Sequence, residues 1–285
     1  MHRLISLAVK PADGDALTAA VQRLAPAGPG RLISRRFWEA ETGEDLADIG
    51  RRLAALPVDW CVQPLPLPPV KLFIADMDSS IIAVECIDEL ADFVGVKAQV
   101  AAITERAMQG ELDFAGALAE RLALLQGLEE AALAQVYAER VRFSDGAATL
   151  LAGLKAAGVH CILASGGFTV FTGRVAEALG FDAHHANRLE LADGVLTGRA
   201  VPPILGPDGK RQVLEQALTA EAVDPADAVA LGDGANDARM IDLAGRGFGM
   251  RAKPALIPHL TANLRHTGLD TLLHFLRLPA RGQTV

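Results

Sequence analysis

The sequence predicts an α/β protein: a Rossmann-like parallel sheet with helices on both faces, an inserted helical cap, and a small α+β module in front. Three almost entirely apolar runs, at residues 70–75, 159–164 and 226–231, are typical of strands buried on both faces of a parallel sheet. Each run is followed by a polar loop that contains glycine or carboxylate residues. Open α/β sheets place their sites at such loops, so the same pattern predicts where the chemistry lies.

Residues 1–66 are expected to form the small α+β module. Its expected elements alternate strand, helix, strand, helix and strand, at residues 4–9, 17–24, 31–38, 46–53 and 58–62. This order of elements resembles the small amino-acid-binding domains called ACT-like. A proline-rich stretch at 64–69 then cannot continue as a helix or a central strand, and we expect an extended connector.

Residues 67–285 are expected to form the second domain, which contains the parallel sheet. Within it, residues 84–142 show apolar side chains at helical spacing only, and they are too many for an ordinary crossover. We therefore expect an inserted helical cap at about 84–142. Asp193 and Gly194, between two apolar stretches, predict a two-residue hairpin.

Composition narrows the classes of partner. The 285 residues include 27 basic and 35 acidic side chains, a net charge of −8. Such a surface repels phosphodiester backbones and anionic lipid, so we expect neither nucleic acid nor membrane as a partner. Three widely spaced cysteines form neither a disulfide framework nor a zinc motif, and the N-terminus lacks the pattern of a secretion signal. These features predict a cytoplasmic protein.

Asp76 and Asp78 directly follow the first buried run. In an extended chain residues i and i+2 point the same way, which would bring both carboxylates into one small volume. Their repulsion must be relieved by a cation or a shared proton, as in a nucleophile beside an acid/base or in a magnesium site. For the pair alone, a polar strand-to-loop turn is an equally good explanation.

Asp233 and Asp237 repeat this theme after the third run, in a loop with two glycines. Oxygen ligands from two strand ends suit a hard divalent ion. Taken alone, the loop could equally be a turn followed by a helix N-cap at Asn236 or Asp237.

Ser165, Gly166 and Gly167 follow the second run and offer a hydroxyl and backbone N–H groups to an anion at a helix start. An N-cap with a tight turn is the alternative. Lys210 opens a later helix and, by itself, is better explained as a surface lysine. Together with the aspartates, however, these groups could neutralise a transferring phosphoryl group.

The combined motifs are similar to the haloacid dehalogenase superfamily of aspartate-nucleophile phosphatases, and within it to the phosphoserine phosphatase family. The resemblance covers about residues 70–255. It rests on five segments, namely Asp76-Met77-Asp78-Ser79-Ser80, Glu85-Cys86-Ile87-Asp88-Glu89, Ser165-Gly166-Gly167-Phe168, Ala186-Asn187-Arg188-Leu189 and Gly232-Asp233-Gly234-Ala235-Asn236-Asp237. Ser80 stands where the family usually has threonine, which keeps the hydroxyl.

The resemblance implies roles for these residues. Asp76 would become an aspartyl phosphate, while Asp78 would protonate the leaving oxygen and later deprotonate water. Mg²⁺ would be held by the Asp76 carboxylate, the Asp78 main-chain carbonyl and Asp233, with Asp237 supporting them. The groups expected around the phosphate are Ser165, the Gly166 N–H, Lys210 and Asn236.

The resemblance also implies that the cap selects the substrate. Glu85 would bind an ammonium group and Arg121 a carboxylate, and Met108 and Phe114 would close the pocket as an apolar lid. Without the resemblance, Glu85 is explained as a first-turn helix acid and Arg121 as a solvated surface residue. Met108 and Phe114 are then explained as core residues.

These implications together predict a phosphatase that hydrolyses the small molecule O-phosphoserine to serine and phosphate, the last step of serine biosynthesis. A homodimer is one assembly it could form. The alternative is a related phosphatase or phosphotransferase that acts on another small phosphorylated alcohol. A signalling receiver that stores phosphate on an aspartate is disfavoured by Asp78 and by the helical insertion.

Overall fold

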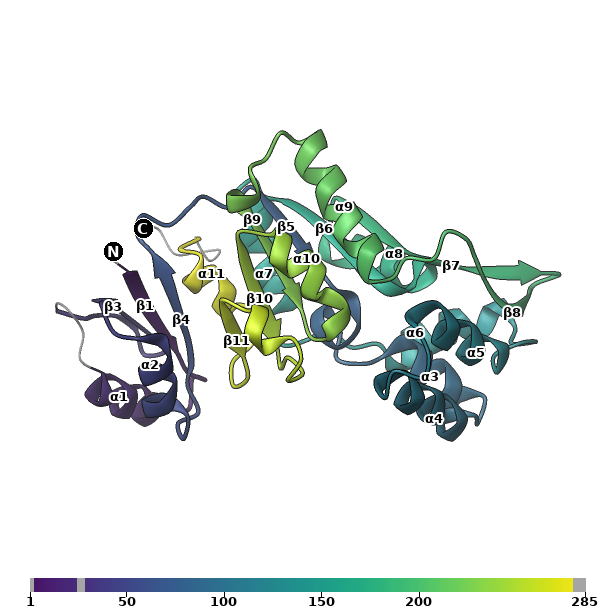
Figure 1. The fold of residues 1–285 in the computed structure, drawn as a ribbon, viewed down its shortest axis with the longest axis horizontal. Coiled ribbons are helices and arrows are strands. Elements are labelled where there is room, and N and C mark those ends of the chain that lie inside the picture. The colour runs from purple at the N-terminus through teal and green to yellow at the C-terminus, as the bar shows by residue number, and fades with distance from the viewer. Residues whose placement is uncertain (1–2, 25–28, 279–285) are drawn as a thin grey trace.

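The computed structural model describes residues 3–24 and 29–278. These residues form a four-stranded sheet near the N-terminus and a seven-stranded sheet with a helical cap beside it (Figure 1). No helix in the described ranges has the length and apolar character that crossing a bilayer requires.

The N-terminal module is an antiparallel sheet with strand order β2-β3-β1-β4, packed against two helices. Its elements are β1 Arg3–Ala8, α1 Gly14–Arg23, β2 Arg31–Ser34, β3 Phe37–Thr42, α2 Leu46–Leu53 and β4 Asp59–Pro64. Ile5, Leu7, Trp38 and Ile49 belong to its separate core, which explains why both helices lie on the sheet. This four-stranded antiparallel module is compatible with the ACT-like fold expected from the sequence.

One element of the module was predicted wrongly. Residues 31–38 are not one strand, because the chain turns at residues 35–36 and pairs β2 with β3 as an antiparallel hairpin. That turn contains arginines instead of the Gly, Asn or Asp that usually mark a hairpin, so the apolar pattern continues through it.

The second sheet has the order β11-β10-β9-β5-β6-β7-β8 and is parallel except where β8 pairs with β7. Its strands are β5 Leu72–Ala75, β6 His160–Phe168, β7 Ala183–Ala192, β8 Val195–Val201, β9 Ala228–Gly232, β10 Arg246–Met250 and β11 Ala262–Leu264. The three apolar runs of the sequence are its central strands β9, β5 and β6, as predicted. Strands β10 and β11 follow them in the chain and were not predicted.

Helices cover both faces of this sheet, which confirms the predicted fold class. Phe73 and Ala75 of β5 belong to one core cluster, and Leu72 and Ile74 belong to another on the opposite face. The helices are α7 Ala147–Ala156, α8 Thr169–Leu179, α9 Pro207–Ala220, α10 Ala238–Leu243 and α11 Thr271–Phe275. Short 3₁₀ turns lie at Pro225–Asp227, Ala235–Asp237 and Ile257–His259.

The cap consists of α3 Cys86–Phe93, α4 Lys97–Met108, α5 Phe114–Ala123 and α6 Glu130–Arg140, in agreement with the predicted helical insertion. Its two connections to the sheet lie side by side, because Ala83 N donates to Arg142 O at 2.9 Å. The chain therefore leaves the sheet and returns to it at one place.

The hairpin of β7 and β8 gives the cap a second attachment (Figure 1). Asp193 and Gly194 both have positive φ in its turn, as the Asp-Gly signal predicts. The Gly127 N–H donates to Leu196 O and the Leu196 N–H donates to Leu128 O, both at 2.8 Å. The loop between α5 and α6 is therefore bonded to the sheet's own hairpin.

Candidate active site

The candidate site lies where the three central strands end. Asp76 directly follows β5, Ser165 lies near the end of β6, and Asp233 directly follows β9. Because β5 pairs with both β6 and β9 in parallel, these ends meet at one edge of the sheet. Lys210 joins them from the first turns of α9.

Asp76 is buried and forms an ion pair with Lys210, with Lys210 Nζ at 2.7 Å from Asp76 Oδ1. The Met77 N–H also donates to Oδ1 at 2.7 Å. Burial raises the pKa of Asp76 well above its usual value, the neighbouring carboxylate of Asp237 raises it further, and the ammonium group of Lys210 opposes both. An additional cation would therefore favour the ionised form that a nucleophile needs.

Lys210 is not a surface lysine, because only 1% of its side chain is exposed. Its Nζ lies 2.7 Å from Asp237 Oδ1 as well as from Asp76. Burial lowers the pKa of Lys210, but the carboxylates of Asp237 and Asp76 raise it by more, so the net shift is upward. The site thus holds a permanent positive charge.

Asp78 faces a different set of partners. Its Oδ1 accepts a hydrogen bond from the Cys86 N–H at 2.8 Å, and its Oδ2 accepts one from Ser165 Oγ at 3.1 Å. Burial raises the pKa of Asp78, while the hydrogen bonds from Cys86 and Ser165 lower it. A raised pKa suits a carboxyl group that must carry a proton in one step and release it in another.

The backbone between the two aspartates differs from the extended chain on which the spacing argument relied. Residues Met77–Ile81 form a single helical turn, inside which Asp78 keeps extended angles and Ser79 has a positive φ of 55°. This turn allows Asp76 to pair with Lys210 while Asp78 pairs with Ser165. The two carboxylates remain close enough for Asp78 to raise the pKa of Asp76.

Three buried carboxylates could hold a metal ion: one oxygen each from Asp76, Asp233 and Asp237 lies within 4.8 Å of the others. Carboxylate oxygens in this arrangement suit a hard divalent cation. Asp237 is also held in place by the backbone, because its Oδ2 accepts hydrogen bonds from the N–H groups of Asp233 and Gly234. A Cβ atom at Gly232 would collide with Asp237, so a glycine is needed there.

The Ser165-Gly166-Gly167 segment continues β6, which runs to Phe168. Helix α8 begins at Thr169, and its N-cap residue Phe168 makes no side-chain cap, so the N-cap explanation is wrong, while the segment does lie directly before a helix start. Ser165 Oγ accepts a hydrogen bond from the Gly167 N–H at 2.9 Å and donates to Asp78. A Cβ atom at Gly167 would strike both Asp78 and Ser165, which explains the glycine.

A family model confirms the resemblance noted in the sequence. The model of the haloacid dehalogenase-like hydrolases matches residues 73–242, which is more than half of the chain. This chain belongs to that family.

Proteins similar to this haloacid dehalogenase-like hydrolase are named phosphoserine phosphatase. The protein of that name from Albidiferax ferrireducens is 47% identical over 215 residues, which cover 74% of this chain and 91% of the relative. A structure described as a probable phosphoserine phosphatase from Vibrio cholerae has a TM-score of 0.79 at 32% identity, and covers 96% of this chain and 86% of its own. A hydrolase of the same family from Salmonella enterica serovar Typhi has a TM-score of 0.87 at 28% identity and covers 99% of both chains.

In this hydrolase two of the residues expected to select substrate lie at the start of α3 and along α5. Glu85 Oε1 accepts a hydrogen bond from Ser79 Oγ at 2.7 Å. Burial, followed by the charge of Asp78, raises the pKa of Glu85 to about 7. Arg121 is partly buried and donates from Nε to Ala117 O at 3.1 Å, and its charge interacts with those of Asp88 and Glu85. It is therefore not an ordinary solvated arginine.

The two expected lid residues differ in position. The Phe114 ring lies against Gly166 and Gly206, where Cβ atoms would come within 2.9 Å and 3.0 Å of it, so it connects the cap to the edge of the sheet. Met108, at the end of α4, is 76% exposed, and the explanation of Met108 as a core residue is wrong. Its role as part of a lid stays a prediction.

Two asparagines order the loops of the site. Asn236 Oδ1 lies over Gly234, where a Cβ atom would collide with it. Asn187 is buried, donates to Gly166 O at 2.8 Å and accepts from the Leu205 N–H at 2.7 Å. In the sequence Asn187 stands out only as part of a motif, and its contacts with these two loops have no separate signal there.

Lys253 was missed entirely by the sequence analysis. It follows β10, a strand that was not predicted, and its Nζ lies 2.9 Å from Asp233 Oδ2. Only the fold brings Lys253 to Asp233, because a lone lysine after a short glycine-rich strand has no recognisable sequence pattern.

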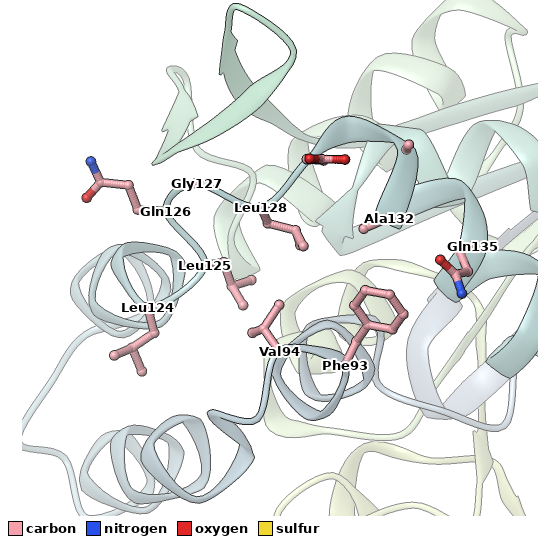
Figure 2. A pocket seen from close by; sticks show the side chains of 11 residues that line it. Phe93, Val94, Leu124, Leu125, Gln126, Gly127, Leu128, Ala132 and Gln135 are labelled. Atoms are coloured by element: carbon pink, nitrogen blue, oxygen red, sulfur yellow. The ribbon is translucent and has the colours of Figure 1, made fainter.

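A cavity of about 430 Å³ lies in the cap, away from these residues (Figure 2). Apolar side chains such as Phe93, Val94, Leu125 and Leu128 point into it from α3 and from the loop between α5 and α6. None of the predicted site residues lines this cavity, so it is separate from the carboxylate cluster.

Proposed function

We propose that this protein hydrolyses O-phosphoserine to serine and inorganic phosphate through an aspartyl-phosphate intermediate. The names of its relatives support this substrate. The observation that carries the proposal is the pairing of Asp76 with buried Lys210 at 2.7 Å, beside an Asp78 that is bonded separately to Ser165. These two aspartates thus occupy different environments, as a nucleophile and an acid/base require.

In the first step, an Asp76 oxygen attacks phosphorus while the bond from phosphorus to the serine oxygen breaks. Protonated Asp78 gives its proton to that oxygen, so serine leaves as an alcohol. The raised pKa of Asp78 favours the protonated form that this step needs.

In the second step, a water oxygen attacks the phosphorus of the aspartyl phosphate. Asp78, now ionised, takes a proton from the water, and the bond between phosphorus and Asp76 breaks to release phosphate. The Asp76 carboxylate and the protonated Asp78 are restored. Lys210, the Ser165 hydroxyl, the Gly166 N–H and Asn236 would bind the phosphoryl oxygens.

Mg²⁺ is the cation that we propose for the Asp76, Asp233 and Asp237 group. Asp76 and Asp233 would bind it through carboxylates and Asp78 through its main-chain carbonyl, with Asp237 as support. When bound, it would neutralise charge on the phosphoryl oxygens. The donor set fits this ion, because all three carboxylates are buried and hard oxygen ligands suit magnesium.

The cap residues would select the substrate. Glu85 would bind the ammonium group of phosphoserine and Arg121 its carboxylate, and Phe114, with Met108, would close over both. The partial burial of Arg121 and its electrostatic interaction with Glu85 support these two roles.

We also propose the division into residues 1–66 and 67–285, which is supported by the separate sheets and by a core cluster confined to the N-terminal module. Because the proposed reaction releases serine, its place in metabolism would be the last step of serine biosynthesis. A homodimer and a cytoplasmic location stay predictions of the sequence.

A phosphate-release assay over a panel of phosphorylated metabolites, with and without Mg²⁺, tests the proposal. Phosphoserine should be the preferred substrate, and chelation of the metal should abolish turnover. Arg121→Ala should raise KM for phosphoserine far more than KM for p-nitrophenyl phosphate, which lacks a carboxylate. Equal effects on both substrates would favour another phosphorylated alcohol as the natural substrate.

A further inference from the structure

Lys253 is an ammonium group at the site to which the proposed reaction gives no role. Its Nζ lies 2.9 Å from Asp233 Oδ2 and 3.9 Å from Glu85 Oε1. Asp233 belongs to the end of the sheet, whereas Glu85 belongs to the start of the cap. A single cation therefore faces one carboxylate of the proposed metal group and one of the proposed specificity group.

Hydrogen bonds fix the position of the Lys253 backbone. The Lys253 N–H donates to Asp233 O at 2.7 Å, and the Ala252 N–H donates to Asn263 Oδ1 at 3.0 Å. Arg251, with a φ of 48°, turns the chain toward the site after β10. These hydrogen bonds hold the backbone of Lys253 beside Asp233, so the side chain starts within reach of that carboxylate.

The side chain, in contrast, is free to change partners. It is 57% exposed, so its four-carbon stem is not held by packing. Lys210 differs, because it is fully enclosed and is shared between Asp76 and Asp237. Among the described residues, Lys253 is the only cation that forms an ion pair with Asp233.

We propose that Lys253 is a positioning residue that competes with the divalent cation for Asp233. Its ammonium group balances the Asp233 carboxylate in the metal-free protein and moves to Glu85 when the cation takes Asp233. The negative charge of Asp233 would then be balanced with or without the metal ion, but the metal ion would bind more weakly. This inference rests on the proposed metal-dependent function.

Competition predicts the direction in which the metal affinity changes when Lys253 is replaced. If the ammonium group must leave Asp233 before a cation binds, its removal should tighten metal binding. It should also relieve the repulsion between two nearby positive charges. A lysine that merely supports the fold of the site would have the opposite effect, because its loss would loosen the carboxylates.

The test is calorimetric titration of Mg²⁺ into chelator-treated protein at pH 7 and fixed ionic strength, a measurement that does not depend on activity. Lys253→Met removes the charge and keeps much of the stem, and Lys253→Arg keeps the charge. Lys71→Met is the matched control, because Lys71 is 55% exposed and pairs with Asp227 at 2.7 Å, next to the opposite ends of the strands. Both methionine variants change the net charge equally.

The dissociation constant of Lys253→Met for Mg²⁺ should be about threefold or more below that of the wild type, the effect expected from losing a partly exposed ion pair. Lys71→Met and Lys253→Arg should stay near the wild type. Equal affinities, or weaker binding by Lys253→Met, would overturn the role of Lys253 alone. If none of the four proteins binds Mg²⁺, the proposed metal-dependent function fails and this inference fails with it.

Discussion

Thr267 donates two hydrogen bonds to the carboxylate of Asp59, from its backbone N–H at 2.8 Å and from Oγ1 at 2.7 Å. Asp59 begins β4 of the N-terminal module, and Thr267 follows β11 of the large sheet. The same buried carboxylate accepts hydrogen bonds from the N–H groups of Arg265 and His266. One enclosed carboxylate thus accepts hydrogen bonds from four donors between the N-terminal module and the second domain, beside other contacts such as the hydrogen bond from Gln63 Nε2 to Phe275 O at 2.8 Å.

Asp59→Ala should lower the free energy of unfolding by about 3 kcal/mol, because several charge-assisted hydrogen bonds are lost and their donors stay partly buried. Thr267→Val removes only the hydroxyl hydrogen bond and should cost about 1 kcal/mol. Urea denaturation of both variants measures the difference. Similar losses in the two variants would show that the backbone hydrogen bonds to Asp59 contribute little.

Asp76→Asn and Asp78→Asn change charge and shape equally but should fail at different steps. Asp76→Asn should lose turnover completely, because the nucleophile is gone. Asp78→Asn should lower kcat by about 10² to 10⁴, the usual contribution of general acid–base catalysis. With p-nitrophenyl phosphate, whose leaving group needs little protonation, Asp78→Asn should release a burst of nitrophenol and accumulate the aspartyl phosphate.

Rapid-mixing absorbance measures this burst, and Asp76→Asn is its control. A burst from Asp76→Asn, or full steady-state turnover by either variant, would contradict the assignment of roles.

The pKa of Glu85, raised to about 7 by burial and then by Asp78, predicts a pH-dependent preference for phosphoserine. Glu85 is ionised above pH 7 and protonated below it, so the charge that would bind the substrate ammonium group disappears on acidification. The ratio of kcat/KM for phosphoserine to that for p-nitrophenyl phosphate should fall about tenfold from pH 8 to pH 6.

Taking this ratio cancels pH effects on the shared phosphoryl chemistry. Glu85→Gln should lower the ratio at pH 8 and make it independent of pH. A wild-type ratio that stays constant over this range would exclude Glu85 as the ammonium ligand.

His274 should make stability depend on pH, because its pKa is lowered to about 4, chiefly by burial, with Glu39 opposing that shift and Arg277, Arg31 and Arg36 adding to it. The ring stacks on Phe37 of the N-terminal module, with 4.2 Å between centroids. In the unfolded chain this histidine has a pKa near 6.5, so on acidification it binds a proton there before it does in the folded protein. Stability is therefore present above pH 6.5 and is lost as the pH falls toward 4.

Between pH 7 and pH 5 the loss attributable to His274 should be about 2 kcal/mol. Urea denaturation at the two pH values measures it. His274→Phe keeps an aromatic ring against Phe37 without the titration, and should reduce the pH difference by that amount. An unchanged difference would assign the pH dependence to other groups.

The strand ends of the site could be predicted from the sequence because burial on both faces leaves a continuous apolar signal. The run at 70–75 ends at Asp76, and the structure places that residue beside Lys210, whose individual pattern indicated only a surface lysine. The motif as a whole was more informative than any single residue, since it ordered four segments along one sheet edge.

Other features had no comparable signal. Strand β10 is short and contains two glycines, and β11 has only three residues, so neither shows a clear apolar run. Lys253 was missed because its role depends on where β10 ends. The hydrogen bonds of Asp59 join residues about 200 positions apart, and no local pattern encodes such a contact.

Attachment of the cap at two separated places limits how it can move. One attachment is the paired connection that includes Ala83 and Arg142, and the other is the hairpin contact at Gly127 and Leu196. A rigid body held at two points retains only rotation about the line through them. A single rotational coordinate thus describes every opening that preserves both attachments, and the Phe114 contact with Gly166 and Gly206 is one that such a rotation can break.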